Sequence, residues 1–188
     1  NLGSHPATLG YLLWNEPHLT SEICYNAHTI AAFHKWLEKC YQTVETMNKA
    51  WQAQFAAFTD VKPPAPQART RWHEVYDKMV SEQADAEAQN APVATDNPAV
   101  SMDWLRFRQD NFAEFFAWEA DVVRAADPDA VITSKIVPFD LYTSHAYGAG
   151  VNTELWERKF LDVIGMDLYS HLDEDFLARW KCDYFLSL

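Results

Sequence analysis

The stretch "GYLLWNEPH" (residues 10–18) decides the fold, because it is a short apolar run that ends abruptly in Asn15, Glu16 and Pro17. Its length and its boundaries, Gly10 and Pro17, are typical of a parallel strand that is covered on both faces. Pro17 has no backbone N–H and cannot continue a strand inside a sheet. The stretch therefore predicts a strand that delivers a carboxylate to its own carboxyl end, where the chain must turn away.

Strands and helices alternate along the rest of the chain. Two more strands are predicted from β-branched or apolar runs, "VITSKIV" (131–137) and "DVIGMDLYS" (162–170). Helical spacing predicts a helix pair over 21–51 with a break near Gln42 and Thr43, an exposed helix over 69–89, a core helix over 101–126 capped by Ser101, a short helix over 153–160, and a last helix from Asp173. This alternation predicts an α/β fold with parallel strands, either a doubly wound sheet or a (β/α)₈ barrel.

The number of strands favours part of a barrel. The chain has 188 residues and a 48% hydrophobic content, enough to bury a sizeable core. Three strands are too few for a complete barrel, which takes about 250 residues and eight strands. We therefore expect residues 1–188 to be the central part of one (β/α)₈ barrel domain of a longer natural chain, with a helical insertion at about 59–100.

Composition argues against several classes of partner. The chain has 15 Lys and Arg against 27 Asp and Glu, a net charge of −12, which argues against binding nucleic acid or anionic lipid. No apolar run approaches the roughly 20 residues of a membrane span. We expect a soluble chain without a membrane partner, with the cytoplasm favoured and the compartment otherwise open. Three widely spaced cysteines, Cys24, Cys40 and Cys182, favour buried thiols over a metal site or disulfides.

The residues at the first strand end are candidates for chemistry, because loops converge at the carboxyl ends of parallel strands. Glu16 is suited to proton transfer and Asn15 to hydrogen bonding with sugar hydroxyls. Trp14, Trp156 and Tyr169 are candidates for flat surfaces against a sugar ring. The alternative, that Asn-Glu-Pro is only a structural turn, stays open from these residues alone.

Three other polar side chains near strand ends are weaker candidates. Lys135 lies late in the second predicted strand, so it either faces the mouth of the site or is paired between strand and helix. His18 and His171 follow strand ends, where they either line the cleft or lie on the surface.

A family resemblance goes beyond these single residues. "LGYLLWNEP" resembles the fourth strand of the retaining glycoside hydrolases with (β/α)₈ barrels, where Asn precedes the catalytic acid/base Glu. Five ordered blocks resemble glycoside hydrolase family 42, the bacterial β-galactosidases: "AFHKWLEKCYQTVETMNKAW" (32–51), "PP" (63–64), "DWLRFRQDNFAEFF" (103–116), "DPDAVITSK" (127–135) and "DVIGMDLYS" (162–170).

The resemblance implies a role for each matching residue. Glu16 corresponds to the acid/base, Asn15 to the contact with the sugar 2-hydroxyl, and Asp167 and Tyr169 to groups at the sixth strand end; His171 and Lys135 are further candidates for substrate binding. The chain would supply strands four to six. The nucleophile, a Glu on the seventh strand, would lie beyond Leu188, so these residues alone are expected to be inactive.

The expected function is cleavage of β-linked sugars with retention, on an oligo- or polysaccharide substrate. The alternative is a carbohydrate-binding or scaffold barrel without hydrolysis. At the positions where the family has zinc-binding cysteines, this chain has Cys24, Asn26 and Thr29, so only one zinc ligand remains. A structural zinc site needs about four ligands, and adding His28 does not reach that number. No metal and no cofactor are therefore expected. Sugar specificity and a homo-oligomer stay open.

Overall fold

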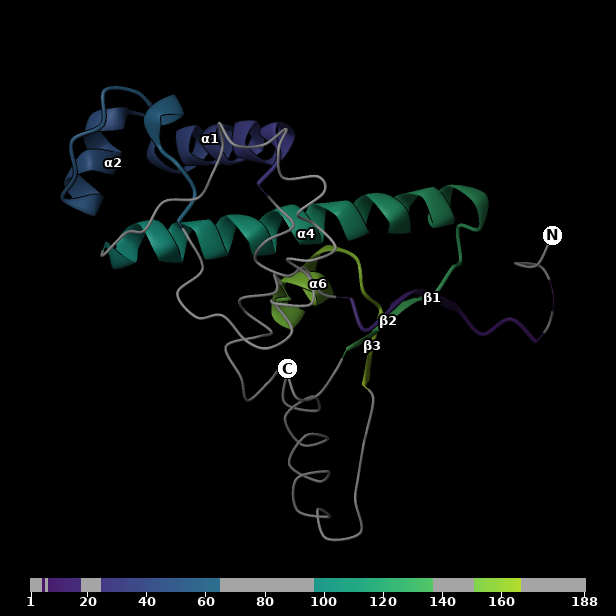
Figure 1. The fold of residues 1–188 in the computed structure, drawn as a ribbon. Helices are drawn as coiled ribbons and strands as arrows, with labels where there is room; N and C mark the ends of the chain where they lie inside the picture. The colour runs from purple at the N-terminus through teal and green to yellow at the C-terminus, as the bar shows by residue number, and fades with distance from the viewer. Residues whose placement is uncertain (1–4, 6, 18–24, 65–96, 137–150, 167–188) are drawn as a thin grey trace, which may run out of the picture. The chain divides into compact units, whose positions relative to one another are not determined.

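The computed structural model describes residues 5, 7–17, 25–64, 97–136 and 151–166 (Figure 1). The chain divides into two compact units: unit 1 contains residues 1–18 and 109–188, and unit 2 contains residues 19–108. The predicted helix over 69–89 and the helix predicted from Asp173 lie outside the described residues. The bounds of the predicted insertion therefore stay a prediction.

Unit 2 contains α1 (Ala27–Tyr41), α2 (Val44–Trp51), the 3₁₀ turn η1 (Phe58–Asp60) and the first part of α4 (Pro98–Ala126). The predicted break between the first two helices is confirmed. Gln42 ends α1 with a φ of 64°, and the Thr43 side chain then accepts a hydrogen bond from the Thr46 N–H at 3.2 Å. Thr43 thereby caps a new helix.

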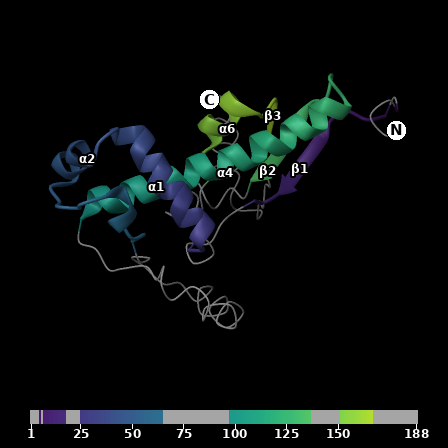
Figure 2. The same cartoon turned by 90° about the horizontal axis from the view of Figure 1, so that it is seen from above.

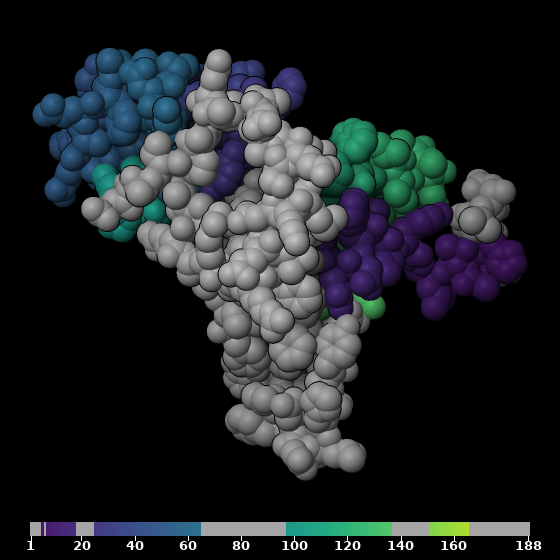
Figure 3. Space-filling model, in the orientation of Figure 1, coloured from purple at the N-terminus to yellow at the C-terminus, as the bar shows by residue number. Residues whose placement is uncertain are grey.

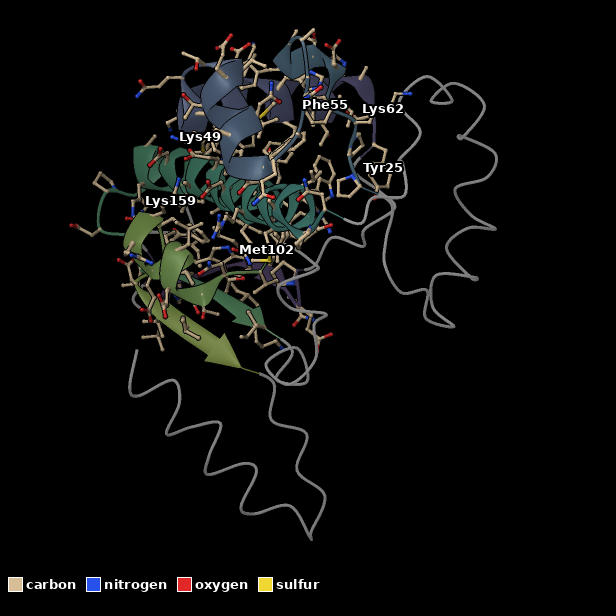
Figure 4. All side chains as sticks on the ribbon, turned by 90° about the vertical axis from the view of Figure 1, so that its left-hand side faces the viewer. Tyr25, Lys49, Phe55, Lys62, Met102 and Lys159 are labelled. Carbon is tan, nitrogen blue, oxygen red and sulfur yellow. The ribbon has the colours of Figure 1, made fainter. Side chains whose placement is uncertain are left out.

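The core of unit 2 is aromatic. Phe33, Leu37 and Met47 are fully buried from the first two helices. Tyr25, labelled in Figure 4, stacks on Trp104 with ring centres 5.7 Å apart. The expectation of three buried thiols is wrong for Cys40, which is exposed on α1; the other two cysteines lie outside the described residues.

A polar cluster lies within this core. Asp103 is 3% exposed, and its Oδ2 accepts hydrogen bonds from the Tyr41 hydroxyl and, at 2.9 Å, from Trp51 Nε1. Arg106 contacts the other carboxylate oxygen at 3.1 Å. Burial, followed by the hydrogen bond to Asp103, raises the pKa of Tyr41 to about 12.

Unit 1 contains the sheet: β1 (Tyr11–Asn15), β2 (Ile132–Ile136) and β3 (Val163–Met166), with α6 (Thr153–Lys159) before β3. The strands are parallel in the order β1-β2-β3, so the predicted α/β fold with parallel strands is confirmed for these residues. Strands adjacent in the chain are adjacent in the sheet, as they are in a (β/α)₈ barrel.

The start of α4 differs from the prediction. The helix begins at Pro98, three residues before the expected cap Ser101. Proline fits the first helical turn, because that position needs no N–H donor. The Asn97 side chain accepts a hydrogen bond from the Ala99 N–H at 3.0 Å just before it.

Helices α4 and α6 cover one face of the sheet (Figures 1 and 2). Ile132, Ser134 and Ile136 of β2 are buried. Phe116 of α4 packs against Trp156 of α6, with ring centres 5.2 Å apart. Trp156 is completely buried in this layer, so its predicted role as a sugar-binding surface is wrong.

Candidate active site

The end of β1 contains one extra residue relative to β2. Leu12 pairs with Thr133 and Asn15 pairs with Lys135, so three steps along β1 correspond to two steps along β2. This irregularity is a β-bulge, which changes the face onto which the following side chains point. Strict alternation would put Leu12 and Asn15 on opposite faces, whereas the bulge puts them on the same one.

The two faces of the sheet are distinguished by their neighbours. The helix-covered face carries Ile132, Ser134 and Ile136, which are buried. We call the opposite side the open face; register and alternation place Leu12, Asn15, Thr133, Lys135, Val163 and Gly165 on it. Leu12 and Val163 are 51% and 53% exposed there. In a barrel the helices lie outside, so the open face corresponds to the interior.

A row of three residues crosses the open face near the strand ends. Asn15 pairs with Lys135, and Lys135 pairs with Gly165 of β3. Gly165 allows close approach of its neighbour, because a Cβ there would lie 3.1 Å from the Ser134 carbonyl oxygen. The row therefore places an amide and an ammonium side by side, next to a position without a side chain.

Glu16 directly follows this row. Its N–H donates to the Lys135 carbonyl at 2.7 Å, which fixes the backbone of Glu16 to β2. Its φ is 52°, an unusual value for a residue with a side chain and especially for one that precedes proline. Strained backbone of this kind concentrates at functional sites. Pro17 is buried, and the strand ends as predicted.

Trp14 lies on the side of the sheet that α4 covers. Its ring packs edge-on against Phe115 and Phe116 of α4, and its Nε1 donates to Glu119 at 2.7 Å. Figure 3 shows the N-terminal segment lying against the C-terminal half of α4. Trp14 thus faces the helices because of the bulge, and the expectation that it contacts substrate stays a prediction. Trp14 anchors the end of β1 to α4.

The prediction that β1 is covered on both faces also needs correction. Trp14 is 46% exposed and Leu12 is 51% exposed, because β1 has a strand neighbour on one side only within the described residues. The other predicted site residues, Asp167, Tyr169, His171 and His18, lie outside the described residues. β3 ends at Met166, directly before Asp167.

Sequence reasoning missed three residues that shape this region. Ser134 donates to the Trp14 carbonyl at 3.2 Å across the bulge, and Glu119 holds the Trp14 indole. Gly165 carried a usable signal, because a glycine inside a strand often marks close backbone approach. The partners of Trp14 carried none, because Glu119 is 105 residues away along the chain.

Metal and membrane features are absent from the described part of the chain. No group of three His, Cys, Asp or Glu side chains there could hold a metal ion. Among the helices described, none combines the length and the apolar character that crossing a bilayer requires.

The class of protein follows from comparison with known families. The sequence model of glycoside hydrolase family 42, described as beta-galactosidase, matches residues 1–183. The chain therefore belongs to glycoside hydrolase family 42, whose fold is a (β/α)₈ barrel, and the resemblance inferred from the sequence is confirmed.

Particular relatives agree with this assignment. Beta-galactosidase BgaP of Planococcus sp. (strain L4) is 26% identical over 173 residues, covering 92% of this chain and 22% of the relative. The beta-galactosidase structure from Rahnella sp. R3 matches with a TM-score of 0.65 and 20% identity, covering 97% of this chain and 23% of that one. An exo-carrageenase of the same family from Bacteroides ovatus matches with a TM-score of 0.56 and 22% identity, covering 84% and 19%. The chain spans about a fifth of the length of the curated relatives it matches.

Proposed function

We propose that this chain is the part of a β-galactosidase-like glycoside hydrolase that supplies barrel strands four to six and the catalytic acid/base. Glu16 would protonate the glycosidic oxygen and then activate water, and Asn15 would hold the sugar 2-hydroxyl. The observation that carries the proposal is the bulged end of β1, which brings Asn15 onto the open face and fixes Glu16 directly after it.

The mechanism we propose is retaining. A covalent glycosyl intermediate would form on a Glu contributed by a segment beyond residue 188. Asp167, Tyr169 and His171, which follow β3 in the sequence, would contact the substrate. A retaining mechanism needs two carboxyl groups about 5 to 5.5 Å apart, so residues 1–188 alone are expected to hydrolyse no glycoside.

The test uses a polypeptide that carries the complete barrel, assayed on a panel of aryl β-glycosides. Glu16→Ala is expected to lower kcat by about 10²- to 10⁴-fold, the range for a lost general acid/base. Added azide should restore turnover in that variant and yield a β-glycosyl azide, because azide needs no general base. Glu154→Gln removes a carboxylate from the exposed Arg158 pair on α6 and is the matched control, expected to keep full activity.

Two results would count against the proposal. Activity of Glu16→Ala equal to that of the unchanged protein would make Asn-Glu-Pro a structural turn. An unchanged protein that binds but does not cleave any glycoside would favour the carbohydrate-binding alternative.

A further inference from the structure

Two residues of β1 lie opposite a single residue of β2 at the bulge. The regular pairs on either side of it leave Leu13 and Trp14 opposite Ser134 alone. A bulge of this kind disrupts the ladder and leaves its extra residue without a regular partner. Ser134 is completely buried, and its hydroxyl donates to the Trp14 carbonyl at 3.2 Å. A side-chain hydroxyl thus joins the two strands at the point where the backbone ladder is irregular.

The side chain of Trp14 is held by a different element. Its Nε1 donates to Oε2 of Glu119 on α4 at 2.7 Å, a short distance of the kind expected for a bond to a carboxylate. The rings of Phe115 and Phe116 lie edge-on to the indole, with centres 6.4 Å and 6.0 Å away. These rings pack against the indole, and the carboxylate fixes the direction of its nitrogen. Trp14 is therefore held at its carbonyl by β2 and at its indole nitrogen by α4.

The residue held in this way lies two positions before Glu16. The Glu16 N–H donates to the Lys135 carbonyl at 2.7 Å, and its φ is 52°. A residue with a side chain keeps a positive φ only where the surrounding structure holds it there. One residue, Asn15, separates Trp14 from this conformation, so a shift of Trp14 would be passed directly to the Glu16 backbone.

We infer that Ser134 and Glu119 are positioning residues for the acid/base: they hold Trp14, and through it they hold the Glu16 carboxyl group where it meets the glycosidic oxygen. This inference rests on the proposed function and deepens it. Ser134 is buried on the helix-covered face and Glu119 belongs to α4, so both act from the side of the sheet opposite to the open face. A general acid must lie within hydrogen-bond reach of the oxygen that it protonates, so a small displacement has a large effect on rate.

The test varies how strongly the substrate depends on the acid, with the polypeptide that carries the complete barrel. The probes are phenyl β-galactoside, whose leaving group needs protonation, and 2,4-dinitrophenyl β-galactoside, whose leaving group departs as a stable anion. The measured quantity is the ratio of kcat/KM for the phenyl probe to that for the dinitrophenyl probe. Ser134→Ala and Glu119→Ala should each lower this ratio about tenfold, within the roughly 10²-fold that a misplacement of 1 Å can cost. The ratio does not depend on how much of a variant is folded.

Three further variants separate positioning from a general loss of structure. Glu119→Gln keeps an acceptor oxygen and should keep most of the ratio of the unchanged protein. Trp14→Phe removes the indole N–H, so combining it with Glu119→Ala should lower the ratio no further than the more affected single variant, because both changes remove the same bond. Glu114→Ala, also on α4, removes the pair with Lys159, which Figure 4 labels, and should leave the ratio unchanged.

The results that would overturn the inference differ from those that would overturn the proposed function. A residue whose alanine variant leaves the ratio unchanged, or lowers it no more than Glu114→Ala does, is not a positioning residue. The proposed function then still stands if Glu16→Ala lowers the same ratio. An unchanged protein that cleaves neither probe, or a ratio that Glu16→Ala leaves unchanged, overturns both.

Discussion

Removing the buried carboxylate of Asp103 is expected to destabilise unit 2 strongly. Asp103→Ala deletes the acceptor for the Tyr41 hydroxyl and for Trp51 Nε1. A hydrogen bond to a charged group contributes about 1.5–3 kcal/mol, and Trp51 keeps a second acceptor, the Tyr41 oxygen at 3.0 Å. The expected loss in the free energy of unfolding is therefore about 3 kcal/mol. With a slope of about 2 kcal/mol per molar urea, the unfolding midpoint falls by about 1.5 M.

Two further variants test whether the loss of stability comes from the buried carboxylate of Asp103 itself. Asp103→Asn keeps a neutral acceptor in the same place and should lose about 1 kcal/mol. Arg106→Ala removes a partner whose side chain is 63% exposed and should lose less than about 1 kcal/mol. Urea unfolding followed by circular dichroism gives all three values. A loss below about 1 kcal/mol for Asp103→Ala, or an equal loss for Arg106→Ala, would refute the reasoning that this carboxylate stabilises the core through its buried donors.

Three further predictions concern pH and backbone geometry. Because the pKa of Tyr41 is raised from 10.0 to about 12, its contribution to stability is complete below pH 10 and is lost as pH rises toward 12. Tyr41→Phe should remove this dependence, together with one tyrosine ionisation near pH 12 in an ultraviolet titration. Glu16→Gly should be about 1 kcal/mol more stable to urea than Glu16→Ala, because glycine adopts a φ of 52° without strain. Gly10→Ala should lower the melting temperature more than Gly165→Ala, because its Cβ would lie 2.7 Å from the Val131 carbonyl oxygen, against a closest approach of 3.1 Å at Gly165.

Each of these three predictions has a result that would contradict it. Identical alkaline stability profiles for Tyr41→Phe and the unchanged protein would show that the hydroxyl is not held neutral by folding. An alanine as stable as a glycine at residue 16 would show that the backbone there is not strained. Equal melting temperatures for the two glycine variants would show that the backbone yields around Gly10.

The sequence was sufficient to predict the ends of strands and helices where the local residue signals agree with the packing. The strand that ends before Pro17 was predicted from its apolar run, and the break between α1 and α2 was predicted near Gln42 and Thr43, where Thr43 caps the second helix. Both depend on residues that are close together in the chain. The start of α4 was missed by three residues, because Pro98 and Asn97 begin the helix more favourably than Ser101.

The candidate site was predicted less completely, because its side-chain directions depend on the pairing between strands. Asn15, Glu16 and Lys135 were identified from their positions at strand ends, but which face each occupies follows from the register with β2. Trp14 was assigned to the substrate side because nothing in the local sequence shows its contact with Glu119 or the bulge before Asn15. Cys40 was expected to be a buried thiol and is exposed in the structure, because the buried stripe of α1 runs through Ile30, Phe33 and Leu37.

The extra residue in β1 has a consequence for how this chain tolerates insertions and deletions. Removing one residue between Leu12 and Asn15 would restore regular pairing with β2, so the sheet itself would be preserved. The same deletion would leave Asn15 two residues after Leu12, so Asn15 would still pair with Lys135 and still lie on the open face. The bulge therefore lengthens β1 by one residue without changing the faces of the residues on either side of it. A one-residue gap in this stretch of an aligned relative is expected to mean a strand without the bulge, in which Leu12 and Asn15 keep their directions.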